Sequence, residues 1–366
     1  MALLLPIGLI SIAATAWLMG WGFLRVIGFL FLIWLAVLVA MLAAPAAEVR
    51  AFSGIDVQAW LIGGAVLALV LGYGTLVRGI RQRVALQWGD DPQASKGAPM
   101  PAPASAPPPA ASDEDALERY SRHILLREIG GPGQAKLRAG RVLIVGVGGL
   151  GAPASLYLAG AGVGHIALID PDTVSLSNLQ RQIIFRSSDA GRPKGLAAAE
   201  ALRALNPLIT VDAMRGQITP GDEALIEGFD LVLDGTDHFA ARAAVNAACV
   251  AAGVPLIAGA ISQWEGQLTT YDPASGGPCM ACIFPDPPPP GAALPCAEAG
   301  VAGPLPGVIG TMMALEAVKH LTGAGTGLTG QMLLFDGLYG ESRRIAITRR
   351  PGCPVCSGLE ARPREA

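Results

Sequence analysis

The stretch that decides the fold runs from residue 141 to residue 151 and reads Arg141-Val-Leu-Ile-Val-Gly146-Val-Gly148-Gly149-Leu-Gly151. Its first five residues form a short, mostly apolar run that predicts a buried β-strand, and the glycines predict a tight turn into a helix. Glycines let the backbone approach a phosphate group, which the N-terminus of the following helix attracts. The stretch therefore predicts a nucleotide site at the carboxyl end of a strand.

Further apolar runs follow at 166–170, 230–234 and 254–258, and residues 194–204 have the composition of a helix. Short strands that alternate with helices predict an α/β fold with a doubly wound, mostly parallel, Rossmann-like sheet. Asp170 ends the second strand, where a carboxylate can bind a ribose hydroxyl. These residues alone fit an ATP-dependent enzyme and an NAD-dependent oxidoreductase equally well.

Three polar features after Asp170 favour a triphosphate over a dinucleotide. They are the string 178–182, which reads Asn-Leu-Gln-Arg-Gln, then Lys194, then the strand end 234–237, which reads Asp-Gly-Thr-Asp. Basic side chains neutralise phosphate charge, and a carboxylate can hold Mg²⁺. A hydride-transfer enzyme has no need of this set, so we expect ATP and Mg²⁺ as the bound groups.

The cysteines predict a metal site. Four of the six form two Cys-x-x-Cys pairs far apart in the sequence, namely Cys279, Cys282, Cys353 and Cys356. Four thiolates suit a closed, tetrahedral, structural Zn²⁺, and the pattern fits a reducing compartment better than a disulfide framework. Cys249 lies on an apolar helix and is expected to pack in the core. Cys296 is left open between sulfur chemistry and no role.

The first 77 residues contain three uncharged, apolar runs. Each is long enough to cross a hydrocarbon core of about 30 Å as a helix. Arginines follow the third run directly, and by the positive-inside rule they place the rest of the chain in the cytoplasm. The sequence thus predicts a multi-pass protein of the inner (cytoplasmic) membrane. The expected spans are about 3–24, 26–46 and 57–77.

The remaining organisation follows from composition. We expect a transmembrane anchor over 1–88, a Pro/Ala-rich linker over 89–115, an α/β domain over 116–358 and a tail over 359–366. The net charge is −3, with no block of like charges. Such a chain offers no nucleic-acid surface.

The soluble region resembles the MoeB/ThiF/HesA family, the bacterial relatives of the ubiquitin-activating enzymes. The resemblance covers roughly residues 116–358 and is strongest to the molybdopterin-synthase adenylyltransferase branch. Its motifs are Arg119-Tyr-Ser-Arg122-His-Ile-Leu-Leu-Arg, the glycine turn, Asp170-Pro-Asp-Thr-Val-Ser-Leu-Ser-Asn178-Leu-Gln-Arg181-Gln182, 234–237, 265–267, 298–301, 307–310 and 351–356.

This resemblance implies an adenylyltransferase. Such an enzyme uses ATP and Mg²⁺ to adenylylate the C-terminal Gly-Gly carboxylate of a small ubiquitin-like sulfur carrier, and it releases pyrophosphate. Arg122 would be an arginine finger in the neighbouring subunit's site, which implies a homodimer. The other implied roles are nucleotide binding by Gly146, Gly148, Gly149 and Gly151, ribose binding by Asp170, phosphate contacts by Asn178, Arg181 and Lys194 with Gln182 beside them, Mg²⁺ binding by Asp237, and zinc binding by the four cysteines.

One departure from the family pattern affects the magnesium strand. The family usually has asparagine after the aspartate, and this chain has His238 after Asp237. Because the aspartate is kept, activity is expected, with a substrate or rate that can differ. No sulfurtransferase domain follows before Ala366, so we expect a separate sulfur donor. The carrier stays open between the molybdopterin pathway and the thiamine or another pathway, and a non-catalytic membrane scaffold would rest on His238 alone.

Overall fold

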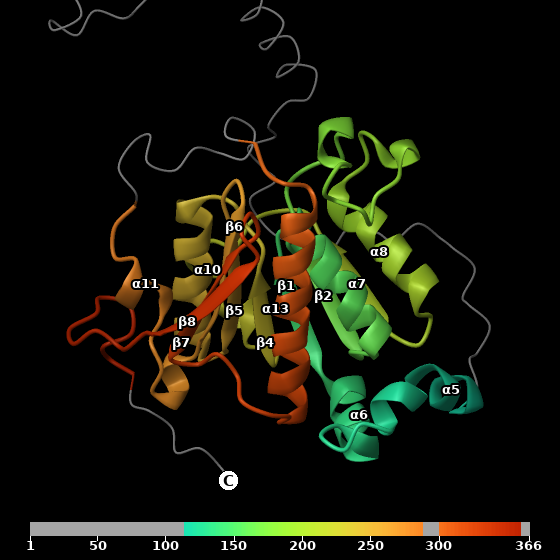
Figure 1. Cartoon of the computed structure of the whole chain (residues 1–366), viewed down its shortest axis with the longest axis horizontal. Helices are drawn as coiled ribbons and strands as arrows, with labels where there is room; N and C mark the ends of the chain where they lie inside the picture. The colour runs from blue at the N-terminus through green and yellow to red at the C-terminus, as the bar shows by residue number, and fades with distance from the viewer. Residues whose placement is uncertain (1–112, 288–299, 360–366) are drawn as a thin grey trace, which may run out of the picture. The chain divides into compact units, whose positions relative to one another are not determined.

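The computed structural model describes residues 113–287 and 300–359, which form one α/β unit (Figure 1). Within these residues the strands build a single 8-stranded sheet in the order β3-β2-β1-β4-β5-β6-β7-β8. The predicted α/β class is confirmed. The sheet is mixed, because its two halves pair in different ways.

The first half of the sheet is parallel. It consists of β1 (Arg141–Val145), β2 (His165–Ile169), β3 (Thr210–Met214), β4 (Leu231–Asp234) and β5 (Leu256–Ile261). The chain moves outward from β1 through β2 to β3 and then returns to β4 on the other side of β1. In open α/β sheets, ligands bind outside the carboxyl ends of the strands at such a reversal. This topology places the predicted nucleotide site between β1 and β4.

The second half of the sheet is antiparallel and was not predicted. It consists of β6 (Glu265–Tyr271), β7 (Gln331–Asp336) and β8 (Glu341–Ala346). The connections from β5 to β6 and from β7 to β8 are too short for a parallel pair, which needs a crossover of a dozen or more residues. β6 and β7 are joined by a long segment that includes α11 and α13, so connection length does not decide how these two strands pair. β8 forms the edge of the sheet, and all six of its residues are exposed.

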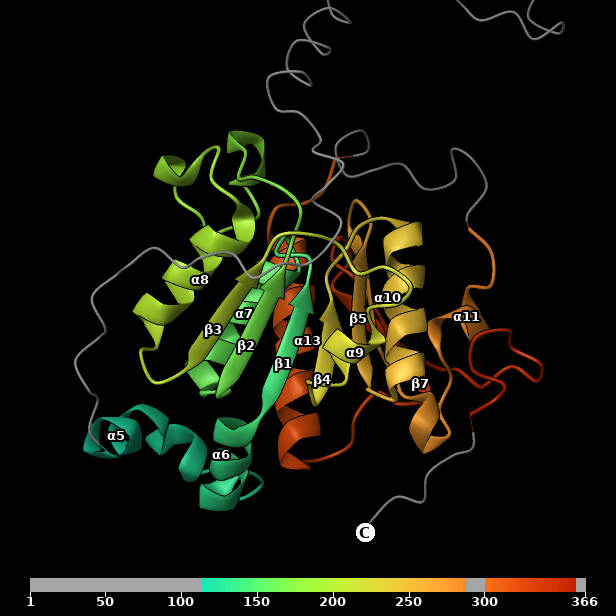
Figure 2. The same ribbon diagram turned by 180° about the vertical axis from the view of Figure 1, so that it is seen from behind.

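Helices cover both faces of the sheet (Figures 1 and 2). Alternate residues of β1 divide between two cores, with Val142 and Ile144 in one and Leu143 and Val145 in the other. The first core is completed by α7 (Gly151–Ala161), α8 (Lys194–Leu205) and α13 (Pro304–Thr322), and the second by α9 (Glu223–Ile226), α10 (Phe239–Ala252) and α11 (Met280–Ile283). Burial on both faces explains why β1 reads as a nearly continuous apolar run.

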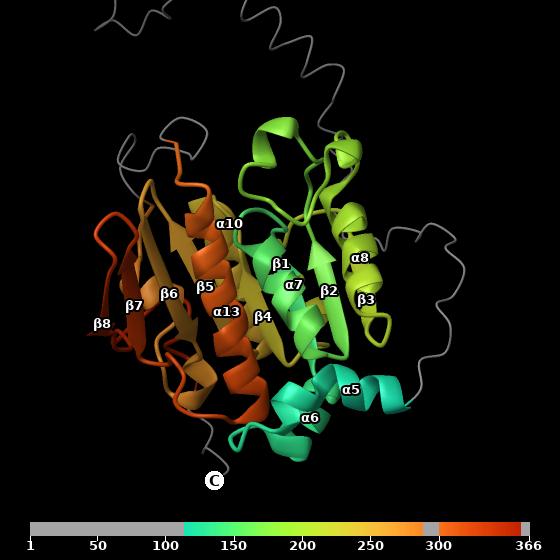
Figure 3. The same ribbon diagram turned by 45° about the vertical axis from the view of Figure 1, so that its right-hand side comes forward.

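Two helices precede β1 and lie at the amino ends of the strands (Figure 3). They are α5 (Asp113–Ile124) and α6 (Gly130–Ala139). The Tyr120 hydroxyl accepts a hydrogen bond from the Asn206 amide at 2.9 Å, and its ring lies against Gly162, where a Cβ would come within 2.5 Å of ring carbons. This contact fixes α5 against the far ends of α7 and α8. Three short 3₁₀ turns complete the unit at Leu176–Asn178, Ser187–Asp189 and Pro273–Ser275.

The structure contradicts the expected multi-pass localisation in the inner membrane. Among residues 113–287 and 300–359, no helix combines the length and the apolar character that a bilayer crossing requires. The 19-residue α13 carries an ion pair between Lys319 and the largely buried Glu316, and its apolar residues pack in the first core. The expected spans at 3–24, 26–46 and 57–77 lie outside the described residues.

Candidate nucleotide site and cysteine cluster

The glycine turn connects β1 to α7 and lies against the end of β4. Gly146 adopts a left-handed φ of 83°, and its N–H donates to the Ile169 carbonyl at 2.9 Å. A Cβ on Gly151 would lie 1.9 Å from the Gly146 carbonyl oxygen, which no side chain can tolerate. The backbone of the turn therefore requires glycine at both positions for its own conformation and packing, and the predicted approach to a phosphate stays a prediction.

Asp170 holds this turn from the end of β2. Its side chain is almost fully buried, and its Oδ2 and Oδ1 accept hydrogen bonds from the Val147 N–H at 2.7 Å and the Asp172 N–H at 2.8 Å. Burial raises the pKa of this carboxyl, and the nearby Lys194 ammonium opposes that rise. The residue expected at the ribose is thus also part of the frame of the glycine turn.

Lys194 begins α8 and lies close to Asp170. Its side chain is 7% exposed, and its Nζ donates to Asp172 Oδ2 at 2.8 Å. The segments around these two residues also pair through a β-bridge between Thr173 and Pro193. Two predicted nucleotide contacts, far apart in sequence, therefore meet beside the glycine turn.

The string 178–182 reaches the same turn. The Asn178 carbonyl accepts the backbone N–H groups of Arg181 and Gln182, which makes the segment a compact turn. Arg181 and Gln182 approach Gly149 and Gly148, since their Cδ and Nε2 atoms lie 3.8 and 3.6 Å from where a Cβ would stand on those glycines. Gln182 is buried, and among the described residues its Oε1 is one of two buried side-chain atoms without a hydrogen-bond partner. A buried amide oxygen without a partner beside a glycine turn fits a polar ligand.

The loop after β4 carries Asp237, the expected magnesium ligand. Its side chain is 74% exposed and lies 3.4 Å from His238 Nε2. The preceding residue, Thr236, is held from two sides. Its N–H and hydroxyl donate to Asp234 Oδ1 at 2.9 and 2.6 Å, and its carbonyl accepts from Arg242 Nε and Nη2 at 3.0 and 2.7 Å. The Asp237 carboxylate is therefore exposed and pairs with the similarly exposed His238, while the backbone before it is held.

Sequence reasoning missed Arg242 and the contact role of Asp234. Arg242 also donates to the Gly259 carbonyl of β5, so it ties the loop to the neighbouring strand. An aspartate two residues before a threonine is a common turn signal, and an arginine one helical turn into the following helix can reach back to the loop. Those two signals could have found the pair.

Arg122 does not join the other predicted site residues within this chain. It lies on α5, at the amino ends of the strands, whereas the glycine turn is at the carboxyl ends (Figure 3). Its side chain is exposed. The buried Tyr120 fixes the opposite face of the helix, so Arg122 points away from its own chain's site. A role for Arg122 in catalysis requires a second copy of the chain.

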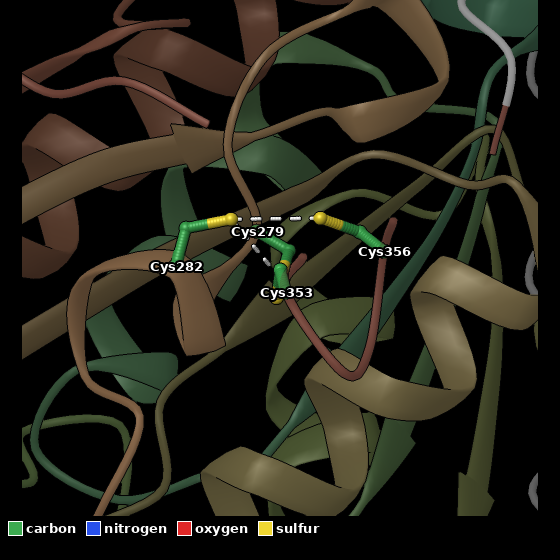
Figure 4. Close-up of side chains that lie close together, drawn as sticks. All are labelled: Cys279, Cys282, Cys353 and Cys356. Carbon is green, nitrogen blue, oxygen red and sulfur yellow. Dashed lines mark hydrogen bonds between the residues drawn. The ribbon is translucent and has the colours of Figure 1, made fainter. Parts of the chain in front are cut away.

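The four predicted metal cysteines converge (Figure 4). All four are buried, and their sulfur atoms lie within 4.8 Å of one another. The Sγ–Sγ distances are 3.8 Å between Cys279 and Cys282, 3.7 Å between Cys279 and Cys353, and 3.5 Å between Cys282 and Cys356. A tetrahedral ion with Zn–S bonds of about 2.3 Å places its sulfurs about 3.8 Å apart. The donor set and its spacing therefore fit Zn²⁺ and are too wide for disulfides.

The thiols of this cluster titrate unequally. Burial raises the pKa of Cys353, but hydrogen bonds from the backbone N–H groups of Cys356 and Val355 and from the Cys279 and Cys282 thiols together bring that pKa down to about 6. Burial, together with the neighbouring Cys356, raises the pKa of Cys279. The Cys353 thiolate therefore forms readily. A second thiolate beside it is disfavoured by burial and by the repulsion of like charges, unless a cation binds between the two.

The other two cysteines differ in what the structure says of them. Cys249 is buried on α10 in the second core, as predicted, and burial raises its pKa. Cys296 lies outside the described residues.

A cavity of about 550 Å³ lies at the carboxyl end of β5, over the antiparallel half of the sheet, and was not predicted. Polar, charged and apolar residues of β5, β6, β7 and β8 and of the turn after β5 line it. Its lining residues are Ala260, Ile261, Ser262, Glu265, Gly266, Gln267, Leu334, Phe335, Asp336, Glu341, Ser342 and Arg343. β5 is the neighbour of β4 in the sheet. The cavity and the glycine turn therefore both lie at the carboxyl ends of the parallel strands.

Comparisons with known proteins agree with this site. The chain is 44% identical over 257 residues to the sulfur carrier protein adenylyltransferase of Thermus thermophilus, covering 69% of this chain and 94% of that protein. It is 47% identical over 255 residues to the sulfur carrier protein ThiS adenylyltransferase of Escherichia coli, covering 69% of this chain and 99% of that protein. The adenylyltransferase and sulfurtransferase MOCS3 of Mus musculus is 44% identical, and the match covers 76% of this chain but 60% of that protein.

Solved structures and a family model complete the comparison. The crystal structure of E. coli MccB with ATP matches with a TM-score of 0.56 and 26% identity, covering 65% of this chain and 74% of that one. The ThiF family model matches residues 120–355, which is more than half of the chain. These residues include the glycine turn, the string 178–182, Asp237 and three of the four clustered cysteines. The chain therefore belongs to the ThiF family.

Proposed function

We propose that this chain uses ATP to adenylylate the C-terminal carboxylate of a ubiquitin-like sulfur carrier. Relatives of 44% and 47% identity are named sulfur carrier protein adenylyltransferases. The observation that carries the proposal is the buried Gln182 side chain beside Gly148, whose amide oxygen has no partner. Arg181 approaches Gly149, and Lys194 lies near Asp170, which holds the turn. A hydride-transfer site would not need two cations and a strand-end aspartate at that edge.

In this reaction a carboxylate oxygen of the carrier attacks the α-phosphorus of ATP. The bond between that phosphorus and the bridging oxygen to the β-phosphate breaks, and pyrophosphate leaves with the electron pair. The product is an acyl-adenylate. The chain contributes mainly alignment and charge neutralisation, which are the main requirements of such a displacement.

The proposed roles follow the positions of the residues. The backbone of the glycine turn lies beside the phosphates, and Asp170 accepts a hydrogen bond from the ribose. Lys194, Arg181 and Asn178 contact the phosphates, and Gln182 Oε1 accepts a hydrogen bond from the ligand. Asp237 would hold Mg²⁺, which when bound neutralises phosphate charge. Zn²⁺ would bind to the cysteine cluster as a closed structural site.

We further propose a catalytic unit over 116–358 that works as a homodimer. The exposed Arg122, on the edge opposite its own glycine turn, would enter the partner's site as an arginine finger. A complementation test checks this: mixing Arg122→Ala with Asp237→Ala protein should restore activity that neither has alone. A failure to complement in verified mixed dimers would contradict the trans role.

The carrier class and the sulfur source are also proposals. A molybdopterin-synthase small subunit is the first candidate, and a carrier of the thiamine pathway is the second, as the E. coli relative's name suggests for that protein. The cavity over β5 to β8 is the surface we propose for carrier docking, because it shares the sheet edge with the glycine turn. A separate protein would supply the sulfur.

The experiment that tests the proposal is ATP–pyrophosphate exchange by the full chain, with candidate carriers added one at a time. Exchange should require one carrier with an intact C-terminal Gly-Gly and should fall about 100-fold in Asp237→Ala. The matched control is Asp212→Ala, which removes an exposed aspartate that pairs with His165. A folded, ATP-binding protein that exchanges with no carrier would contradict the carrier assignment, and binding of NAD in place of ATP would contradict the reaction class.

A further inference from the structure

Asp172 connects two residues of the proposed ATP site. Its N–H donates to Asp170 Oδ1 at 2.8 Å, and its carbonyl accepts the Lys194 N–H at 3.0 Å. Its carboxylate oxygen Oδ2 accepts a hydrogen bond from the Lys194 ammonium, with 2.8 Å between Oδ2 and Nζ. The first two contacts belong to the backbone and the third to the side chain, so the carboxylate can move without releasing either neighbour.

The two partners of the ion pair differ in exposure. The Lys194 side chain is 7% exposed, whereas the Asp172 side chain is 64% exposed. A largely buried ammonium without a partner is costly, because desolvation disfavours its charged form. The solvated carboxylate, by contrast, loses little when its partner is replaced, since water takes over its hydrogen bonds.

We infer that Asp172 is a placeholder counter-ion: it pairs with Lys194 until a nucleotide phosphate takes its place. The inference rests on the proposed function, which puts the phosphates beside Lys194. Phosphate oxygens are strong acceptors for an ammonium and carry more charge than one carboxylate. The Asp172 charge would then lie next to the phosphates and repel them, so Asp172 lowers nucleotide affinity while it holds the Lys194 side chain in position in the free protein.

The test is a comparison of ATP and adenosine binding by isothermal titration calorimetry, at constant Mg²⁺, on the full chain and on Asp172→Asn. Asparagine keeps the shape and both backbone contacts and removes the charge. We expect Asp172→Asn to bind ATP about two- to fivefold more tightly, the range expected from partly exposed charge pairs. Adenosine, which has no phosphate, should bind equally to both proteins.

The control is Asp212→Asn. Asp212 is 61% exposed and pairs with His165 at 2.8 Å, so it matches Asp172 in residue type, exposure and contact length. Asp212 lies in the middle of β3, and its partner His165 is at the amino end of β2. Replacing Asp212 removes the same charge away from the glycine turn and should leave ATP affinity unchanged. Circular dichroism and thermal unfolding check that each variant is folded.

A second background separates competition for Lys194 from long-range repulsion. In Lys194→Met protein, replacement of Asp172 by asparagine should increase ATP affinity by less than half of the increase that it gives in the wild type. An equal gain in both backgrounds would overturn the placeholder role.

The remaining outcomes are also decisive. Weaker ATP binding by Asp172→Asn would mean that the carboxylate positions Lys194 for the phosphate. Equal binding by the two proteins would mean that the carboxylate neither competes with the phosphate nor positions Lys194. Either result overturns this inference and leaves the proposed function standing. A folded wild-type protein that binds no ATP overturns the proposed function and the inference with it.

Discussion

The proposed nucleotide site, at the carboxyl ends of β1, β2 and β4, and the cysteine cluster lie in the same domain but are stabilised in different ways. At the proposed nucleotide site, the glycine turn is held by hydrogen bonds from the Gly146 N–H to the Ile169 carbonyl and from the Val147 N–H to Asp170 Oδ2. The cluster gathers four sulfurs within 4.8 Å, where the pKa of Cys353 falls and that of Cys279 rises. The backbone of the first region is held by the protein's own hydrogen bonds, although Gln182 Oε1 lacks a partner. The second region needs a cation before all its ligands can ionise.

This contrast teaches which region tolerates the loss of its bound group. Removal of nucleotide leaves a framework that its own hydrogen bonds maintain. Removal of the proposed zinc would leave thiols packed around one charge, at the point where α11 meets the C-terminal segment 351–359. The two regions should therefore respond independently to substitution, and four experiments test that independence.

The largest expected effect is at the cluster. Cys353→Ser should lose its zinc and lower the free energy of unfolding by more than about 5 kcal/mol, since structural zinc contributes on the order of 10 kcal/mol in zinc-finger peptides. Metal analysis and chemical denaturation measure both, with Cys249→Ala as the control cysteine. ATP affinity should change by less than about twofold, measured at low denaturant. A large loss of ATP binding in folded protein would refute the independence of the two regions.

The next effect is at the glycine turn. Gly151→Ala places a Cβ 1.9 Å from the Gly146 carbonyl oxygen, so the turn must open. We expect a loss of about 4 kcal/mol in the free energy of unfolding and loss of ATP binding, with zinc retained. Gly160→Ala, in the same helix, meets no atom within 4 Å and is the matched control. Retained ATP binding by Gly151→Ala would show that the turn is less rigid than its contacts indicate.

A smaller effect, on rate alone, is expected at the proposed magnesium residue. Asp237→Ala should lower pyrophosphate exchange about 100-fold with little change in stability, because its side chain is 74% exposed and lacks core contacts. His238→Asn, which installs the residue usual in the family, should stay close to the wild-type rate. Comparable exchange by Asp237→Ala and wild type would remove Asp237 from the site.

The smallest effect concerns the loop that carries Asp237. Arg242→Gln removes the guanidinium that holds the Thr236 and Gly259 carbonyls, so the loop should become less well positioned. We expect about tenfold slower exchange with an unchanged KM for ATP. Arg203→Gln also removes a guanidinium contact to a carbonyl, that of Val211, but on α8 and away from this loop, and it should have no such effect. A rise in KM instead would assign Arg242 to nucleotide binding.

Local patterns explain what could be predicted from the sequence. The β1 strand and its glycine turn are contiguous in sequence, so their pattern could be recognised. The spacing of the two Cys-x-x-Cys pairs is typical of a metal site, so the cluster could be predicted as well. The antiparallel half was missed because β8 is exposed along its whole length and lacks the alternation of a half-buried strand. The ion pair of Asp172 with Lys194 was missed because it depends on pairing between segments 172–174 and 191–194. Contacts of that kind follow from tertiary structure and have no signature in the spacing of residues.

The exposed edge strand β8 has a practical consequence for handling the protein. An unpaired strand edge can recruit the edge of another molecule and begin aggregation. Here the strand carries Glu341, Arg343 and Arg344, and charges on an edge oppose such pairing by keeping the backbone solvated. Replacing the two arginines with valine should therefore shorten the time for which concentrated protein stays monodisperse, even if the native fold is unchanged.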